Sequence, residues 1–141
     1  MAKRRPRKKY FTLEEAGATL PLLRSILRDV TELARCLAER HQRIVSLQSG
    51  GAIDRAHAEE LQSLVGDFER EQDRMREYED EIRKLGVELK DHFTGLVDFP
   101  CWMDGREVYL CWRLGEDEIG HWHEVDAGFA GRQKLSQGVL N

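Results

Sequence analysis

Two long stretches of the chain carry apolar residues at alternating steps of three and four. In the first stretch these are Leu23, Ile26, Val30, Leu33, Leu37, Ile44 and Leu47, and in the second they are Leu61, Leu64, Phe68, Met75, Tyr78, Ile82 and Leu85. This spacing places the side chains on one face of an α-helix, and it is the repeat of a coiled-coil seam. The segment Ser-Gly-Gly-Ala at residues 49–52 is typical of a loop. The pattern predicts a long antiparallel helical hairpin over residues 10–86.

The ends of the two helices carry recognisable signals. Thr12 can cap the first helix, and Glu15, three residues later, can complete a capping box. Pro21 has no backbone N–H, so we expect either a kink there or a short first helix that ends just before it. Asp54 is a plausible cap for the second helix, and Gly86 is a good terminator.

Two positions within the helical seams are polar, Arg40 and Glu71. A turn centred near Gly51 places Arg40 near Gln62 and Glu71 near Thr31, so we expect that they do not pair within one hairpin. They are then either solvated or meet partners in a second chain. Because a two-helix hairpin has a narrow interface, we expect a homodimer in which a second hairpin completes a four-helix bundle. The alternative is that the rest of the chain covers the apolar stripe.

After Gly86 the apolar pattern changes to alternation. Four segments, VELKD, GLVDFPCW, REVYLCWRL and EIGHWHEV, have the alternating β-branched and aromatic residues of strands. Asp104-Gly105 is a strong hairpin-turn signal. Pro100 cannot donate to a neighbouring strand, so we expect its strand at an edge. The antiparallel helices should bring Tyr10 and Phe11 close to these aromatic strands.

Together these patterns predict an α+β fold in which a coiled-coil-like antiparallel two-helix hairpin precedes a small antiparallel β-meander of three to four strands. One domain covers residues 10–135, with the hairpin in 10–86 and the meander and C-terminal loop in 87–135. Residues 1–9 form a basic disordered arm, and residues 136–141 form a tail. Alternation assigns Val108, Leu110 and Trp112 to one face of their strand and Tyr109, Cys111 and Arg113 to the other. Ile119, His121, His123 and Val125 share one face of theirs, opposite Trp122 and Glu124.

Charge and cysteine content narrow the classes of function. The net charge is -4, yet residues 1–9 hold six of the 22 Lys and Arg, so the remainder is strongly acidic. Nucleic acid is therefore not an expected partner, except weakly through the basic arm. Three cysteines without a CxxC spacing favour a reduced, cytoplasmic protein over a disulfide scaffold, and we expect them to pack as small core residues. No stretch is long and apolar enough for a membrane span, and no signal peptide is expected.

The last strand segment carries the candidate chemistry. His121 and His123, two apart on a strand, could share a metal ion, with Asp98 or Asp126 completing the set. Two placed ligands are too few for a metal prediction, and two partly exposed imidazoles beside an aromatic patch are the simpler interpretation. Glu124 and Asp126 could instead act with His123 in acid–base chemistry, although nothing supplies a nucleophile.

Structural roles compete with each of these. The acidic residues could form cross-strand salt bridges with Arg106, Arg113 and Arg132. The glycine-containing loop at residues 126–133 could hold an anion, or its Phe129 could plug the junction of sheet and helices. The candidate ligand-binding set is Asp98, Trp112, Arg113, Trp122, His123, Glu124, Asp126 and Arg132.

Two segments, YFTLEEAGATLPLLR near the start and the block from Leu85 to Leu135, resemble a bacterial family of uncharacterised proteins, domain of unknown function 2203. The resemblance covers residues 10–135. The chain differs from the family pattern at Gly17, where asparagine is usual, and at His121, where most members do not have histidine. The second difference weakens the hypothesis of a two-histidine metal site. No activity, cofactor or substrate comes with it. The matching residues are Gly95, Asp98, Phe99, Arg106, Trp112, Arg113, Glu118, Trp122, His123, Glu124, Asp126, Gly128, Phe129, Gly131 and Arg132.

The sequence therefore leaves three hypotheses for function and does not decide whether the chain is an enzyme. The first is an interaction or scaffold protein that assembles through its hairpin and presents the sheet to a protein partner. The second is a ligand-binding or enzymatic module with its site at His123, Glu124, Asp126 and Arg132. The third is weak polyanion binding through the basic arm. The first needs only the heptad pattern, which is the strongest signal in the chain.

Overall fold

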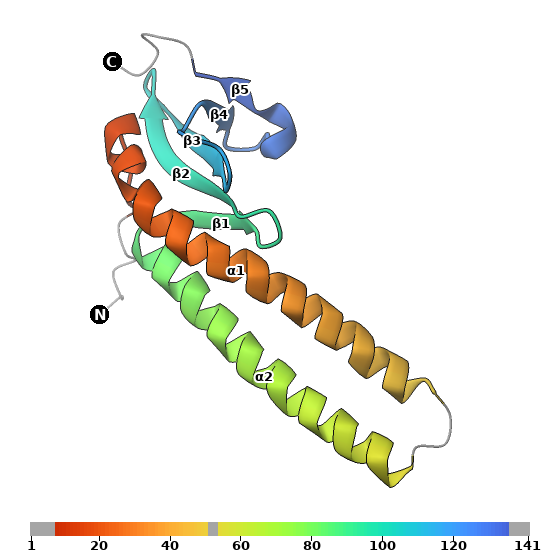
Figure 1. Cartoon of the computed structure of the whole chain (residues 1–141). Coiled ribbons are helices and arrows are strands. Elements are labelled where there is room, and N and C mark those ends of the chain that lie inside the picture. Colours follow the sequence, from red (N-terminus) through yellow and green to blue (C-terminus); the bar gives the residue numbers. More distant parts are fainter. Residues whose placement is uncertain (1–7, 51–53, 136–141) are drawn as a thin grey trace, which may run out of the picture.

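Two long antiparallel helices lead into a small antiparallel sheet, which lies where the first helix begins and the second ends (Figure 1). The computed structural model describes residues 8–50 and 54–135. The helices are α1 (Leu13–Gln48) and α2 (Arg55–Lys84). The strands are β1 (Glu88–Asp91), β2 (Leu96–Met103), β3 (Arg106–Arg113), β4 (His121–Glu124) and β5 (Gln133–Lys134), with a 3-10 turn, η1 (Phe129–Gly131), before the last. The predicted α+β fold with a helical hairpin is confirmed.

The sheet has five strands in sequence order rather than the three to four expected. The additional strand, β5, has two residues and pairs with β4. A strand this short has no alternation to detect, which is why the sequence did not reveal it. Of the predicted basic arm only Lys8 and Lys9 are described, and the predicted tail lies outside the described residues.

The first helix begins with the predicted capping box. Thr12 Oγ1 accepts a hydrogen bond from the Glu15 backbone N–H at 3.0 Å, and Glu15 accepts one from the Thr12 N–H at 3.2 Å. The helix does not end before Pro21 but continues through it, and Figure 1 shows its first turns running at an angle to the remainder. One missing N–H bends a helix, and the apolar residues on either side of Pro21 hold both parts in the core.

The Asp104-Gly105 turn joins β2 and β3 as predicted, with positive φ at both residues (51° and 77°). The expectation that β2 is an edge strand is wrong, because β1 and β3 flank it. Pro100 is tolerated because β1 pairs with β2 only as far as Asp98, so nothing there requires a proline N–H. The Pro100 carbonyl instead accepts a hydrogen bond from the Phe11 N–H at 2.7 Å, which ties the helix start to the sheet.

The core lies between the helices and one face of the sheet. Its strand residues include Val97, Phe99, Cys101, Val108, Leu110 and Trp112, and its helix residues include Leu20, Leu23, Leu27, Val30 and Ile82. Phe11 packs edge-to-face on Phe99 with ring centroids 5.2 Å apart, as the predicted closeness to the aromatic strands requires. Ile119 also belongs to this core, so the expectation that it shares a face with His123 is wrong. Gly120 and the end of the turn separate Ile119 from β4, and strand alternation does not extend across them.

The two polar exceptions of the hairpin seams pair with each other, contrary to expectation. Arg40 donates to both carboxylate oxygens of Glu71, at 2.6 and 3.1 Å. Side chains on a helix lean toward its N-terminus, so in antiparallel helices these two lean toward each other and close their axial offset. Cα positions alone do not include this lean, so they place Arg40 and Glu71 too far apart to pair. Among the described helices, none has the length and apolarity that crossing a membrane requires.

Candidate functional site

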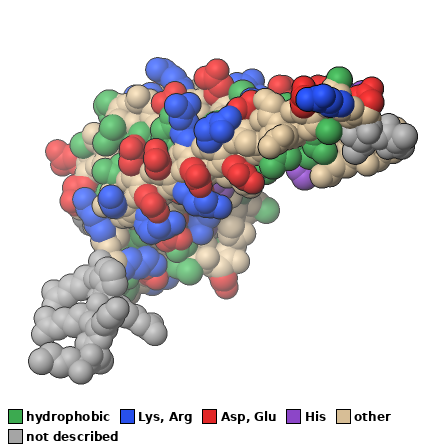
Figure 2. Space-filling view, turned by 90° about the horizontal axis from the view of Figure 1, so that it is seen from below, with side chains coloured by type: hydrophobic (Ala, Val, Ile, Leu, Met, Phe, Trp, Pro, Cys, Tyr) green, Lys and Arg blue, Asp and Glu red, His purple; other side chains and the backbone are tan. Residues whose placement is uncertain are grey.

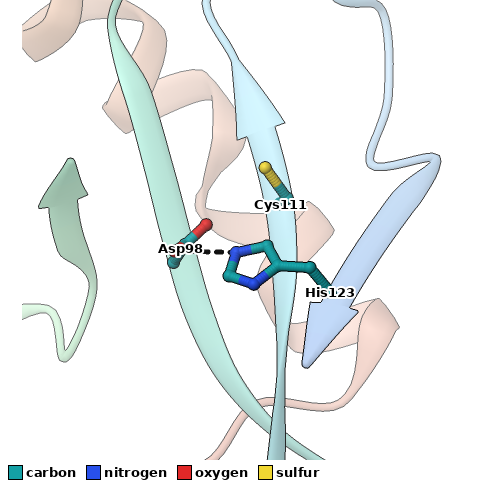
Figure 3. Close-up of side chains that lie close together, drawn as sticks. All are labelled: Asp98, Cys111 and His123. Carbon is teal, nitrogen blue, oxygen red and sulfur yellow. Dashed lines mark hydrogen bonds and ion pairs between the residues drawn. The ribbon is translucent and has the colours of Figure 1, made fainter. Parts of the chain in front are cut away.

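The face of the sheet that points away from the helices carries three buried polar side chains. Asp98 of β2, Cys111 of β3 and His123 of β4 come from adjacent strands and converge (Figure 3). Their placement follows from alternation, since Asp98 and Cys111 each lie between two core residues of their strand and His123 follows Trp122, which packs against the core. Asp98 is 3% exposed and His123 2% exposed, although α1 and α2 both pack on the opposite face of the sheet. We call these three residues the sheet cluster.

His123 is held at both ring nitrogens. Nε2 lies 2.9 Å from Asp98 Oδ2, and Nδ1 lies 2.7 Å from the backbone carbonyl oxygen of Glu124. A carbonyl oxygen only accepts, so Nδ1 carries a proton, and a second proton between Nε2 and Asp98 Oδ2 can belong either to the ring or to the carboxyl group. Two acceptors cannot share a hydrogen bond without a further proton or another cation between them. The 2.9 Å contact therefore requires either a shared proton or a metal ion between the two atoms.

Cys111 and the second carboxylate oxygen complete the sheet cluster. The ligand atoms of Asp98, Cys111 and His123 all lie within 4.8 Å of one another. Among the described residues, Asp98 Oδ1 has no hydrogen-bond partner. Burial raises the pKa of Asp98 even though the contact with His123 opposes this. Burial, together with the charge of Asp98, raises the pKa of the Cys111 thiol to about 12, while Arg132 acts in the opposite direction.

A pocket of about 300 Å³ opens beside the sheet cluster, with Asp98 and His123 in its wall. The segment after β4 contributes Val125, Gly128 and Phe129, and the strands contribute Lys90, Leu96 and Tyr109. The centroids of the Tyr109 and His123 rings lie 5.4 Å apart. Lys90 Nζ lies 5.4 Å from the centroid of the same Tyr109 ring. The cluster is therefore buried within the protein but borders a space that a small molecule could enter.

Of the other candidate ligand residues, Arg132 borders Cys111, whereas Glu124, Trp112 and Asp126 do not converge on this cluster. Glu124 forms a two-bond ion pair with Arg106, at 2.6 and 3.2 Å, and the Arg106 guanidinium lies over the Trp122 ring. Trp112 is in the core and donates from Nε1 to the Glu116 carbonyl oxygen at 3.2 Å. Asp126 is exposed and makes no hydrogen bond or ion pair with any described residue. These side chains have structural roles, apart from Asp126, for which the geometry shows none.

The remaining two candidates, Arg113 and Arg132, both place their guanidinium groups near the Phe129 ring, 5.6 and 5.1 Å from its centroid. Arg132 also pairs with Glu116, a residue that sequence reasoning overlooked. Burial alone would raise the pKa of Glu116, but hydrogen bonds from Arg132 and from the Arg113 backbone N–H outweigh it and lower the pKa. His121 Nδ1 lies 3.8 Å from Glu116 Oε2, so His121 belongs to this network and not to the sheet cluster.

Sequence reasoning also missed Cys111, which it assigned to the core. The signal that could have revealed it is the Asp104-Gly105 turn. Asp98 lies six residues before Asp104 and Cys111 six residues after Gly105, so a two-residue hairpin turn places them directly opposite. The longer turn between β3 and β4 has no such fixed register, so the position of His123 could not be predicted in the same way.

A second hollow, of about 440 Å³, lies where the hairpin meets the β1–β2 turn. Most of its lining is apolar; the residues are Ala34, Leu37, Ala38, His41, Phe68, Met75, Lys90, Asp91, His92 and Phe93. Phe93 at its rim is 58% exposed. Figure 2 shows charged side chains spread over the hairpin face in view, with hydrophobic side chains along one border of the hairpin. We call the hollow lined by these ten residues the hairpin groove.

The family model described as "Uncharacterized conserved protein (DUF2203)" matches residues 9–135 of the chain. The chain belongs to this family. No curated protein and no solved structure matches the chain. The family match agrees with the resemblance in the sequence and assigns no function.

Proposed function

We propose that this protein is an assembly module whose hairpin binds a second copy of the same chain through the hairpin groove. The observation that carries the proposal is the groove itself, an apolar hollow with an exposed phenylalanine, Phe93, on an otherwise charged hairpin. Large exposed apolar patches with polar rims mark interaction sites in soluble proteins. The role is that of an interaction or scaffold protein, which leaves the sheet available to a further protein partner.

The burial along the hairpin favours a second hairpin as the occupant. Beyond the sheet, the seam residues Leu37, Leu61, Leu64 and Phe68 are only half-buried, because two helices enclose a seam on too few sides. A second antiparallel hairpin would supply the missing sides of a four-helix bundle. The rim of the groove carries both signs of charge, Lys90 and Asp91, which suits a two-fold interface where the same surface faces itself.

Sedimentation equilibrium of the full chain tests the proposal. We expect a dimer at micromolar concentration and its dissociation by Phe93→Asp, which places a charge in the groove at an exposed turn position. Leu22→Asp is the matched control, since Leu22 is similarly exposed (52%) but lies outside the groove; this variant should remain dimeric. A wild-type chain that stays monomeric at all concentrations, or equal dissociation by both variants, would overturn the proposal.

The cytoplasmic location belongs to the same proposal. Its support is that Cys36, Cys101 and Cys111 are all free thiols, two of them buried. Weak nucleic-acid binding through the basic arm stays a prediction: most of the arm lies outside the described residues, and Lys8 forms an ion pair with Glu107. Salt-sensitive binding that is lost on deletion of residues 1–9 would support it.

A further inference from the structure

We propose that Asp98, Cys111 and His123 bind a zinc ion through one oxygen, one sulfur and one nitrogen, with a fourth coordination position open to the adjacent pocket. The site lies on the sheet and does not depend on the assembly proposed for the hairpin. Three protein ligands and one open position are the arrangement of zinc sites that bind an exchangeable molecule.

The spacing of the three ligand atoms suits a tetrahedral ion. Zinc–ligand bonds of roughly 2.0–2.3 Å place neighbouring ligand atoms about 3.5 Å apart. In the sheet cluster all three atoms lie within 4.8 Å of one another, and His123 Nε2 is already 2.9 Å from Asp98 Oδ2. Small side-chain rotations would widen the contact between His123 and Asp98 and shorten the longer distances. The strands themselves need not move, because adjacent backbone pairing fixes Asp98 opposite Cys111 and His123 opposite Tyr109.

The hydrogen bonding of His123 orients it as a metal ligand. Its Nδ1–H donates to the Glu124 carbonyl oxygen at 2.7 Å, so Nε2 is the nitrogen that faces the cluster and that offers a lone pair once it carries no proton. Metal-bound histidines in proteins are typically held in this way by a backbone carbonyl or carboxylate behind the ring. The bond fixes both the tautomer and the ring orientation before any ion arrives.

The unpartnered oxygen of Asp98 is the independent observation that points to a ligand. Asp98 is 3% exposed, and Oδ1 has no hydrogen-bond partner among the described residues. A proton between Asp98 Oδ2 and His123 Nε2 would satisfy those two atoms and leave Asp98 Oδ1 with only a weak thiol donor, Cys111, beside it. A divalent ion would contact all three side chains, and its charge would balance the Asp98 carboxylate and a Cys111 thiolate.

The surrounding charges permit this neutral arrangement. The two cationic side chains nearest the cluster are already paired, Arg132 with Glu116 and Lys90 with Glu88. The donor set also selects the metal: a thiolate and an imidazole suit zinc and similar transition metals, whereas magnesium and calcium require oxygen ligands. The class of ligand is therefore a borderline-soft divalent ion, with Zn²⁺ as the expected occupant.

The test uses untagged full-length protein, stripped with a chelator under reducing conditions and then titrated with Zn²⁺ and separately with Co²⁺. We expect one equivalent of either ion to bind, with Co²⁺ giving a thiolate-to-cobalt charge-transfer absorption in the near ultraviolet. Cys111→Ser should abolish this absorption. Cys101→Ser is the matched control, because Cys101 is an equally buried cysteine on the helix-facing side of the sheet; it should retain the absorption.

A second variant keeps the outcome decisive if Cys111→Ser folds poorly. Asp98→Asn preserves the shape of the carboxylate and should retain the sulfur–cobalt absorption while weakening affinity at least about tenfold. His57→Ala removes an exposed histidine that lies 3.0 Å from Asp54 and could bind metal adventitiously; affinity should not change. Folded wild-type protein that binds neither ion, or absorption that survives in folded Cys111→Ser or depends on Cys101 or His57, would overturn the proposal.

Discussion

The distal arm of the hairpin and the sheet differ most in how their residues are buried. Helix α2 buries two of its 30 residues, whereas β2 buries six of its eight. The arm encloses one narrow seam, and its polar faces are solvated. The sheet is covered by helices on one face, and on the other it encloses Asp98, Cys111 and His123. A polar residue among apolar ones therefore has different consequences in the two regions.

In the arm, a polar residue within the seam finds a partner across it and stays partly solvated. Arg40 and Glu71 are an example, with side chains about one quarter and one fifth exposed. In the sheet, Asp98 and His123 have almost no contact with water, so a missing partner leaves a buried charge or an unmet hydrogen bond. We therefore expect most of the stability to be concentrated at the sheet end of the molecule, and four comparisons test this.

The largest difference is expected between leucines at the two ends of the hairpin. Leu23 is fully buried against the sheet, whereas Leu61 lies half-buried in the arm. Leu23→Ala should lower the free energy of unfolding by about 3–4 kcal/mol, and Leu61→Ala by about 1 kcal/mol. Denaturant unfolding at one protein concentration measures both. Equal losses would contradict the uneven distribution of stability.

A pair of histidines gives the second comparison. His123→Ala removes a buried ring and leaves Asp98 without its partner, so we expect a loss of about 3 kcal/mol. His57→Ala, at the exposed start of α2, should change stability by less than about 0.5 kcal/mol. Denaturant unfolding of chelator-stripped protein separates this effect from any metal. If Asp98→Asn combined with His123→Ala is more stable than His123→Ala alone, the recovered part of the loss comes from the unpaired carboxylate, and equal stability would contradict this assignment.

Two glutamates provide the third comparison, through pH. Hydrogen bonds from Arg132 and the Arg113 N–H hold the pKa of Glu116 below its ordinary value, so its contribution is present above the unfolded pKa and is lost as pH falls through the folded one. Glu116→Gln should therefore cost about 2 kcal/mol at neutral pH and progressively less in acid. Glu60→Gln removes an exposed partner of Arg43 and should cost less than about 0.5 kcal/mol. Denaturant unfolding from neutral to acidic pH measures both; parallel curves would contradict the assignment.

The smallest effect is expected for the ion pair within the arm. Arg40 and Glu71 form two hydrogen bonds but remain partly exposed, so their coupling should be about 1 kcal/mol. A double-mutant cycle with Arg40→Leu and Glu71→Leu measures this coupling directly. A coupling as large as that of Asp98 with His123 would show that the arm is less solvated than its exposure indicates.

Much of the architecture could be predicted because it depends on neighbouring residues. The leucine and isoleucine spacing defined both helices, Thr12 and Glu15 defined the start of α1, and Asp104-Gly105 defined the β2–β3 turn. Backbone geometry is local, so a period of three and four or of two identifies an element and the face of each side chain within it. The same reasoning placed Asp98 and His123 among the candidates and named Asp98 as one of two carboxylates that could join the histidines, although it could not choose between Asp98 and Asp126.

Other features were decided only by contacts between distant segments. Pro100 is tolerated inside the sheet because β1 stops short of it, and Arg40 meets Glu71 because the side chains of opposed helices lean together. Burial of the second sheet face, which converts Asp98, Cys111 and His123 from surface residues into a cluster, depends on where residues after β4 fold back. The sequence by itself therefore determined the elements and their faces, whereas only the tertiary structure decided which faces are closed to water, because burial depends on residues far apart in the chain.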